Sequence, residues 1–404
     1  MASLFSPGRL GNLVLNNRMI RSASHEGLAD ERGAPTQAQW EFYKGFVEGG
    51  IGLVITGYAG IQQNGKSALY RMTMMDSDAL IPAHKAMVDN IHAIGGKIVL
   101  QLAHCGRQTS SEDTKAPYIV APSPLRYIFY AETPHEMAEQ DIQEVIDNFA
   151  GAARRAKQAG YDGVQVHGAH GYLLSSFLSR AANKRTDQWG GSPENRFRIV
   201  DRSLHAVREA VGKDYPVLIK LNSYESSRDG IRADECLRFA TMVEATGCCD
   251  AIEISAGTNT NVFYMARGGF PTDTILRYYR PFCTFSAFLK VLTRMFGGIV
   301  ARFLVPEFIE GYNLETAARV KQAVSLPVIT VGGMRTKRFM DTAIREAKTD
   351  FVSMARPLLL EPDLANKFRN GLSEAARCDN CNMCLIASDT LPIRCHKRQY
   401  ATIQ

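Results

Sequence analysis

Two histidines stand three positions apart in the stretch VHGAHGYLLSSFLS, which covers residues 166–179. His167 and His170 follow an apolar run, with Gly168 and Gly171 beside them. Such a pair could bind a metal ion, act in catalysis, or simply pack at the end of a strand. The spacing by itself leaves these three interpretations open.

Four of the nine cysteines gather near the C-terminal end, within CDNCNMCLIASDTLPIRCH at residues 378–396. The spacing C-x2-C-x2-C-x10-C is formed by Cys378, Cys381, Cys384 and Cys395. Four thiolates can hold a 4Fe–4S cluster or a structural zinc ion. Because four cysteines fall within eighteen residues, a metal site is favoured over coincidental thiols.

Two turns late in the chain have the composition of a phosphate site. GGMR at 332–335 follows the apolar run PVITV, and MARPL at 354–358 follows DFVS. Glycines there let backbone N–H groups approach an anion, and Arg356 could add a bidentate contact. The alternative is a pair of tight turns with a surface arginine, but both turns together favour bound phosphate.

Gln101 and Lys220 each end an apolar run and carry groups that suit a flavin ring. The glutamine amide can both donate to and accept from an amide-type ring edge. A lysine can neutralise negative charge that develops on an electron-accepting ring such as a reduced flavin. An ordinary salt bridge is the alternative for Lys220.

Eight short apolar runs, each followed by a turn and a helix-like stretch, must position these groups. The predicted strands are 17–23, 51–56, 97–102, 162–167, 216–221, 250–255, 327–331 and 350–354. Strands rich in Val and Ile that alternate with amphipathic helices predict an α/β fold, a (β/α)8 TIM barrel. An open doubly wound sheet is the alternative. In a barrel, the carboxyl ends of all eight strands face one mouth, where the polar residues above would meet.

Between strands six and seven, residues 274–311 are predicted to be a helical insertion. Its central part, 282–305, is very apolar but contains Lys290, Arg294 and Arg302, which make a membrane-spanning helix unfavourable. A helical hairpin that covers the barrel mouth or forms a homo-oligomer contact is the favoured interpretation. A basic amphipathic segment on a membrane surface is the other.

Composition and charge narrow the class of protein. The chain has 404 residues, of which 45% are hydrophobic and 22% are charged, as in globular proteins. A net charge of +6 is weak support for nucleic-acid binding, so no nucleic-acid partner is expected. The N-terminal stretch MASLFSPGRLGN lacks the features of a secretory signal, which predicts a cytoplasmic protein whose cysteines are not in disulfides.

Residues 163–198, GVQVHGAHGYLLSSFLSRAANKRTDQWGGSPENRFR, resemble the signature of the old yellow enzyme family of FMN-dependent oxidoreductases. Further similar pieces follow in family order: LNNRMIRSAS at 15–24, QLAHCGR at 101–107, PVLIKLN at 216–222, VGG at 331–333 and MARPLLLEPDL at 354–364. The resemblance implies a barrel with one FMN, which NADH or NADPH reduces and which passes hydride to an activated alkene or similar small molecule.

The resemblance also implies roles for particular residues. His167 and His170 would hold the carbonyl or nitro oxygen of the substrate, and Tyr172 would donate the proton, as a phenol can at neutral pH. The implied flavin contacts are Ser22, Ala23, Ser24, His25, Tyr58, Gln101 and Lys220, and the implied phosphate contacts are Gly332, Gly333, Ala355 and Arg356. His25, where many members have Cys or Thr, resembles the branch of 2,4-dienoyl-CoA reductase and could tune the flavin or protonate substrate.

The cysteine-rich segment is similar to the cluster-binding segment of trimethylamine dehydrogenase and 2,4-dienoyl-CoA reductase, although its last spacing is slightly shorter. Because the sequence ends at Gln404, the flavin and nucleotide domain that follows in those relatives is expected to be absent. Three possibilities stay open: a cluster served by a separate electron-transfer protein, a zinc knuckle, or a vestigial site. Iron–sulfur is favoured over zinc.

The sequence thus predicts an FMN-binding barrel at 1–370 with the insertion at about 274–311, followed by a Cys-rich segment at 371–404. The predicted activity is transfer of hydride from NAD(P)H through FMN to an enone, an enoyl thioester or a nitro compound. The alternatives are an amine or ether dehydrogenase of the trimethylamine dehydrogenase type and a non-catalytic flavin electron carrier. A metal-dependent barrel hydrolase that uses His167 and His170 as ligands is a further alternative.

Overall fold

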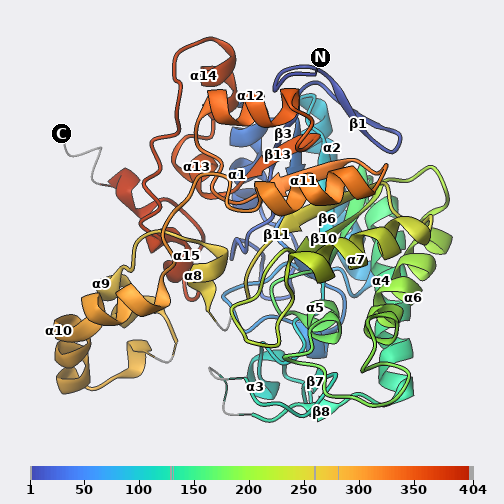
Figure 1. The fold of residues 1–404 in the computed structure, drawn as a ribbon, viewed down its shortest axis with the longest axis vertical. Coiled ribbons are helices and arrows are strands. Elements are labelled where there is room, and N and C mark those ends of the chain that lie inside the picture. The colour runs from blue at the N-terminus through green and yellow to red at the C-terminus, as the bar shows by residue number, and fades with distance from the viewer. Residues whose placement is uncertain (1, 128–129, 131, 259–260, 281, 400–404) are drawn as a thin grey trace.

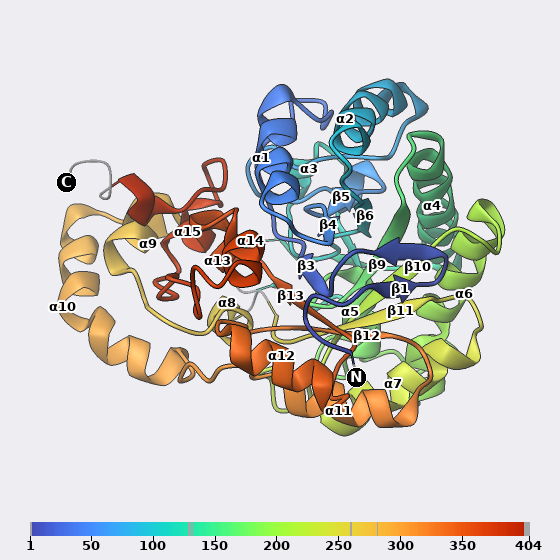
Figure 2. The ribbon, with the colours of Figure 1, turned by 90° about the horizontal axis from the view of Figure 1, so that it is seen from above.

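Eight parallel strands close into a barrel in the computed structural model of the chain, which describes residues 2–127, 130, 132–258, 261–280 and 282–399 (Figures 1 and 2). The barrel strands are β3 (Met19–Arg21), β4 (Leu53–Ile55), β6 (Ile98–Ala103), β9 (Gly163–Gly168), β10 (Val217–Asn222), β11 (Ala251–Ser255), β12 (Val328–Val331) and β13 (Phe351–Met354). Since β4 pairs with both β3 and β6, the sheet has no open end among these strands. The predicted TIM barrel is confirmed, and the open doubly wound sheet is wrong.

Short strands lie outside the ring. They are the antiparallel pair β1 (Gly8–Leu10) and β2 (Leu13–Leu15), the pair β7 (Val120–Ala121) and β8 (His135–Glu136), and β5 (Ala59–Gly60), which extends along β6. Leu10, Leu13 and Leu15 of the first pair pack against Ile20, Leu53, Val99, Leu218, Ala251 and Ile329 from the barrel strands. This apolar cluster fills the barrel at the amino ends of its strands, so a ligand must enter from the opposite end.

The helices that follow the strands form an outer layer (Figure 2). Those between successive barrel strands are α1 (Gln37–Glu48), α2 (Ile81–Ala93), α4 (Glu139–Gln158), α6 (Pro193–Val211), α7 (Ala233–Ala245), α11 (Leu314–Ala323) and α12 (Lys337–Arg345). Several begin at a side-chain cap. The Thr36 hydroxyl accepts from the N–H of Gln39 at the start of α1, and the hydroxyl of Ser192, which precedes Pro193, accepts from the N–H of Asn195 at the start of α6. Shorter helices in the connecting segments are α3 (Ser111–Thr114), α5 (Leu173–Leu178), α8 (Val262–Met265), α13 (Arg356–Leu360) and α14 (Leu364–Arg369).

The predicted insertion between β11 and β12 is helical, and it consists of α9 (Thr272–Tyr278) and α10 (Ala287–Leu304). Position 281 of the predicted range 274–311 lies outside the described residues. Figures 1 and 2 show α10 at the edge of the molecule, beyond α9, rather than over the barrel mouth. Within the described part of the chain, every helix is too short or too polar to cross a membrane.

The C-terminal segment folds back onto the barrel instead of standing apart from it. Its helix α15 (Met383–Ala387) packs on α9, and Ile393 donates its N–H to the carbonyl of Glu26 at 2.8 Å. Tyr70 likewise donates to the carbonyl of Asp389 at 3.3 Å. The segment therefore closes over the loops that follow β3 and β4. The division of the chain into two parts at residue 370 stays a prediction. Residues 400–404 of the second part lie outside the described residues.

Candidate functional site

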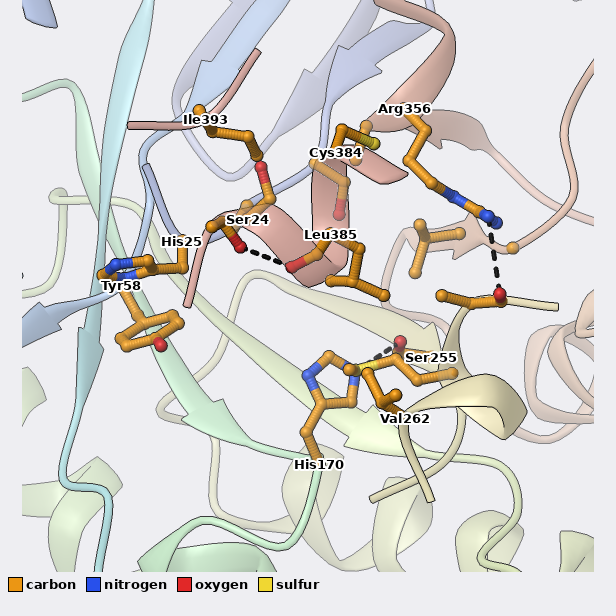
Figure 3. Close-up of a pocket in the computed structure, with 18 of the residues that line it drawn as sticks. Ser24, His25, Tyr58, His170, Ser255, Val262, Arg356, Cys384, Leu385 and Ile393 are labelled. Carbon is orange, nitrogen blue, oxygen red and sulfur yellow. Dashed lines mark hydrogen bonds between the residues drawn. The ribbon is translucent and has the colours of Figure 1, made fainter. Parts of the chain in front are cut away.

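A cavity of about 220 Å³ opens at the carboxyl ends of the barrel strands. All fourteen residues that the sequence assigned to catalysis or flavin binding line it: Ser22, Ala23, Ser24, His25, Tyr58, Gln101, His167, His170, Tyr172, Lys220, Gly332, Gly333, Ala355 and Arg356. Figure 3 shows His25 and Tyr58 toward one end of the cavity and Arg356 toward the other. The predicted ring contacts and the predicted phosphate contacts thus lie apart, as an elongated ligand requires.

The parallel register of the strands brings distant polar residues to one level. Lys220 on β10 is paired with His167 on β9 and with Glu253 on β11. Lys220 Nζ lies 3.2 Å from a carboxylate oxygen of Glu253 and donates to the Ser22 hydroxyl at 3.1 Å. The lysine is therefore held in place inside the barrel by Glu253 on the neighbouring strand β11 and by Ser22, which follows β3.

Glu253 is the centre of a buried polar network below the cavity. Its carboxylate accepts hydrogen bonds from Ser22 at 2.8 Å, Ser353 at 2.7 Å and Gln165 at 2.8 Å. Gln165 in turn accepts from the Gln101 amide at 2.7 Å. Burial opposes ionisation of Glu253, but Lys220 and these donors outweigh it and lower the pKa of the carboxyl below its usual value. The network fixes Gln101 and Lys220 through one buried anion.

His167 and His170 are neutral at physiological pH in this setting. Burial lowers the pKa of both rings well below the ordinary 6.5, and the positive charge of Lys220 lowers them further. The N–H of Ala169 donates to Nδ1 of His167 at 3.2 Å, so the proton of the neutral ring lies on Nε2. His167 therefore presents a hydrogen-bond donor and no charge.

Backbone geometry fixes the second histidine. His170 has φ +63°, a left-handed conformation that costs a side-chain-bearing residue energy and marks functional loops. Its N–H donates to Asn222 Oδ1 at 3.1 Å, and its carbonyl accepts from the Gln108 amide at 2.9 Å. Its Nε2 lies 2.8 Å from the hydroxyl oxygen of Ser255, a contact that Figure 3 shows. The second ring is thus locked beside the first, with centroids 5.1 Å apart.

Aromatic rings continue the histidine wall. The Tyr172 ring lies 5.0 Å from that of His167 and 5.2 Å from that of Tyr58, measured between centroids. Tyr172 comes directly before α5, and the adjacent N–H of Leu173 donates to the carbonyl of His104 at 2.9 Å. Burial raises the pKa of the Tyr58 phenol, so that side chain stays protonated. The wall therefore combines a neutral histidine donor with a phenol on the same loop.

His25 lies on the far side of Tyr58, with a ring centroid distance of 5.5 Å. Its Nε2 donates to the Tyr70 carbonyl at 2.8 Å, and burial lowers its pKa to about 4 despite that bond. The ring is therefore neutral at physiological pH, and its one N–H is already engaged by a carbonyl. The ring therefore has no further N–H to donate to a ligand, and the role predicted for His25 stays a prediction.

The loops after β12 and β13 form the other end of the cavity. Gly332 and Gly333 have φ +128° and +74°, and a Cβ on Gly332 would come within 2.6 Å of Asn313 and Tyr312. Arg356 donates to the carbonyl of Arg267 at 3.2 Å and to Asn382. Only glycine fits the first loop, and the second carries a cation that is already oriented by the C-terminal segment.

Arg335 also lines this end of the cavity, although sequence reasoning assigned it no role. The side chain is buried, and within the described structure its Nε has no hydrogen-bond partner. Burial lowers its pKa to about 10, which still leaves the guanidinium charged at neutral pH. A buried cation with an unsatisfied donor beside two glycines points to an anionic group of a ligand.

One wall of the cavity comes from the start of the predicted insertion, which the sequence had placed near the barrel mouth, and from the C-terminal segment, which it had not connected with the pocket. Tyr279 and Arg280, after α9, line it together with Cys384, Leu385, Ile386, Ser388, Asp389 and Ile393 of the C-terminal segment. Figure 3 shows Leu385 between the His25 end and the Arg356 end. The Cys-rich extension thus forms part of the pocket itself.

The four C-terminal cysteines surround a second, smaller cavity of about 20 Å³. Cys384 and Arg356 line both cavities, so the two sites adjoin. In the described part of the chain, however, no three His, Cys, Asp or Glu side chains converge in an arrangement that could hold a metal ion. The side chains as they lie do not form a ligand set, and metal binding at these residues stays a prediction.

Sequence reasoning missed Gln165, Glu253 and Arg335. A signal for the first two exists, because GVQVHG and AIEIS carry polar residues two positions apart, at Gln165 with His167 and at Glu253 with Ser255. Residues two apart on a strand face the same side, so both pairs point into the barrel. Arg335 is the last residue of GGMR, and it could have been grouped with the two glycines as a phosphate contact.

Comparison with known proteins places this geometry in a family. The family model of the "NADH:flavin oxidoreductase / NADH oxidase family" matches residues 3–262 and 304–375. An NADH oxidase from Thermoanaerobacter brockii is 32% identical over 398 residues, which are 97% of this chain and 55% of that protein. The chain spans about half the length of the first curated relatives it matches.

Solved structures agree with the fold. A 2-naphthoyl-CoA reductase in complex with 2-naphthoyl-CoA superposes with a TM-score of 0.80 at 25% identity, over 96% of this chain and 56% of that one. An old yellow enzyme homologue from Zymomonas mobilis superposes with a TM-score of 0.73 at 22% identity, over 98% of both chains. The resemblance read from the sequence is confirmed: the chain belongs to the NADH:flavin oxidoreductase / NADH oxidase family.

Proposed function

We propose that the chain is an FMN-dependent reductase that takes hydride from NADH or NADPH and passes it to an activated alkene, such as an enone or enoyl thioester, or to a nitro compound. The observation that carries the proposal is the uncharged histidine pair held rigidly beside Tyr172 in the mouth of the barrel. The 2-naphthoyl-CoA reductase among the similar structures supports a thioester as one substrate class.

The cavity fits FMN on its own residues. Gln101 and Lys220, fixed by Glu253, would hold the ring, and the glycine pair with Arg335 and Arg356 would hold the phosphate. Arg335 supports this assignment because its buried Nε lacks a partner within the described structure. Bound FMN supplies hydride transfer between the nicotinamide and the substrate carbon.

The histidines and the tyrosine carry the protein's share of the chemistry. The Nε2–H of His167 donates to the carbonyl or nitro oxygen of the substrate, and His170 beside it completes the grip. A donor aimed at an oxygen that gains negative charge stabilises the transition state, which is usually a large contribution to catalysis. That polarisation makes the β carbon electrophilic, and Tyr172 then supplies the proton to the α carbon.

Amine oxidation is the weaker alternative because the cavity is poorly suited to a cation. Besides the cations assigned to the flavin, Arg280 lines it, whereas Asp389 is the one carboxylate among its described lining residues. Burial raises the pKa of Asp389, which weakens even that counter-charge. A non-catalytic flavin electron carrier would not require the strained backbone conformation at His170.

The proposed activity predicts a defined reaction of the FMN-loaded protein. Without oxygen, NADH or NADPH should bleach the flavin absorbance, and an α,β-unsaturated ketone or enoyl thioester should restore it, with one equivalent of alkene reduced per nucleotide consumed. A tertiary amine should leave the oxidised flavin spectrum unchanged. Reduction of the flavin by the amine and not by either nucleotide would overturn the proposal in favour of the dehydrogenase.

Replacing Arg335 with methionine is expected to weaken FMN binding by about 10- to 100-fold. A charge-assisted hydrogen bond contributes about 1.5–3 kcal/mol, and about 1.4 kcal/mol changes a dissociation constant tenfold. Titration of the apoprotein with FMN and, separately, with riboflavin checks the assignment. Riboflavin lacks the phosphate, so its affinity should be unchanged.

The matched control for this variant is Arg338→Met, since Arg338 lies three residues further on and is exposed. It should bind FMN as the unaltered chain does. An equal loss of FMN and riboflavin affinity in Arg335→Met would mean that Arg335 supports the fold of the loop rather than the phosphate.

We further propose that Cys378, Cys381, Cys384 and Cys395 bind a 4Fe–4S cluster or zinc after they draw closer together. Their shared cavity supports this proposal. Their present separation requires movement of the side chains, so no step of the flavin chemistry is assigned to a metal. Metal analysis of the same preparation distinguishes iron from zinc.

A further inference from the structure

Helix α10 of the insertion presents an unusually apolar surface. Phe303 is 83% exposed, Phe288 is 72% exposed and Met295 is 67% exposed. Leu289, Val291, Phe296, Ile299 and Leu304 are also exposed large hydrophobic residues of this helix. Most exposed apolar side chains of a protein are scattered singly, whereas a contiguous row marks an interaction surface.

The opposite edge of α10 is tied to the rest of the insertion. Arg294 forms an ion pair with Asp273 at 2.8 Å, and a Cβ on Gly297 would come within 3.0 Å of the Thr272 hydroxyl. Asn261 donates to the carbonyl of Leu304 at 3.1 Å. Because 3.6 residues make one helical turn, this attachment directs the row of Phe288, Met295, Ile299 and Phe303 away from α9.

The insertion carries an excess of positive charge. Residues 272–304, which span α9 and α10, contain five lysines and arginines but one acidic residue, Asp273, which gives a net charge of +4. The whole chain has a net charge of +6. The excess positive charge of the protein is therefore concentrated in the segment that exposes the apolar row.

We infer that α10 docks on the surface of an anionic lipid bilayer, lying along it without crossing it. The aromatic and aliphatic row would enter the boundary between headgroups and acyl chains, and Arg302, which is exposed beside that row, would face lipid phosphates. Eighteen residues make a helix of about 27 Å, and the absence of a spanning helix among the described residues agrees with this placement.

A second copy of the chain is the main competing occupant, and the charge disfavours it. Two insertions of net charge +4 would repel each other across an apolar contact, whereas anionic lipid attracts them. The segment also falls between the two stretches that match the family model, 3–262 and 304–375. The surface therefore lies outside the stretches that match the family model, apart from the barrel strands that carry the flavin site.

Flotation of the full chain with lipid vesicles tests the inference. Vesicles of equal parts phosphatidylglycerol and phosphatidylcholine should carry the protein upward, vesicles of phosphatidylcholine alone should carry much less, and added salt should weaken binding. The double variant Phe288→Ser/Phe303→Ser should lose at least tenfold in binding. Leu372→Ser is the matched control, since Leu372 is 75% exposed but lies outside the insertion, and it should bind normally.

Absence of flotation with the anionic vesicles would overturn the inference, and so would equal flotation of Phe288→Ser/Phe303→Ser and Leu372→Ser. Sedimentation equilibrium tests the competing occupant. If the chain forms a dimer that the double variant abolishes, and if it does not bind vesicles, the apolar row contacts a second copy instead of a membrane. Thermal unfolding shows that the surface variants remain folded. Vesicle binding requires no flavin, so its outcome is independent of the proposed reductase activity.

Discussion

His167→Ala is expected to lower kcat/KM for an enone by about 100- to 1000-fold, the usual cost of removing one donor to a developing oxyanion. Flavin affinity should remain close to that of the unaltered chain, because the predicted flavin contacts are held by Glu253 and the glycine loops. Stopped-flow measurement of the two half-reactions checks this expectation: reduction by NAD(P)H should continue, while reoxidation by the enone slows. The double variant with His170→Ala should cost less than the product of the single effects, since the rings lie 5.1 Å apart and act together.

His167→Asn is the matched control, because an amide keeps an N–H donor and should retain part of the lost activity. The pH profile gives an independent check. Both rings have a pKa well below 6.5, so kcat/KM should show no inflection near that pH. An inflection at pH 6.5 that His167→Ala abolishes would contradict the neutral donor and favour a charged imidazolium.

Glu253→Gln is expected to destabilise the fold by about 3–5 kcal/mol, as breaking a buried ion pair does when it leaves one charge without its partner. Lys220 and Glu253 are almost fully buried and 3.2 Å apart. Because typical domains have free energies of unfolding of about 5–15 kcal/mol, replacing this one carboxylate with an amide would remove a large part of the stability of the fold. Urea denaturation at neutral pH measures the change.

The pH dependence of that loss has a definite sign. The folded-state pKa of Glu253 lies below the ordinary 4.5, so its ionised form stabilises the native state above about pH 4.5, and this contribution disappears as the pH falls through the folded pKa. The difference between Glu253→Gln and the unaltered chain should therefore shrink in acid.

Ser353→Ala is the control for the Glu253 variant, since it removes one neutral donor to the same carboxylate and should cost about 0.5–1.5 kcal/mol. Adding Lys220→Met to Glu253→Gln should restore part of the stability, because both charges are then gone. If Glu253→Gln costs no more than Ser353→Ala, the buried pair is not the main support of the network.

The barrel could be read from the sequence because its strands are buried on both faces. Continuous runs such as IGLVIT and KIVLQL, each bounded by turns, predict such strands; β4 lies within the first run, and β6 covers most of the second and ends one residue beyond it. The common mouth follows from parallel strands alone, which is why residues as distant as Ser22 and Arg356 could be grouped before their positions were known.

Other parts of the site have no local signature. The wall formed by Leu385 and Ile393 depends on the approach of the C-terminal segment to the loops after β3 and β4, which are more than 300 residues earlier. The alternation in AIEIS indicates only that Glu253 faces the barrel interior; its role depends on Ser22, Gln165, Lys220 and Ser353, which come from four other parts of the chain. The orientation of α10 was left open, because an amphipathic pattern does not say which face meets the protein.

The closure of the ring has a consequence for synthesis on the ribosome. The first barrel strand, β3, pairs with the last, β13, and Arg18 donates to the carbonyl of Asp350 across 332 residues. At about 5–20 residues per second, translation separates the two by on the order of 20–60 s. Throughout that interval the growing sheet has an unpaired edge, which is a template for pairing with other nascent chains. We therefore expect that, if the nascent chain needs a chaperone, it needs it during that interval, before β13 emerges from the ribosome.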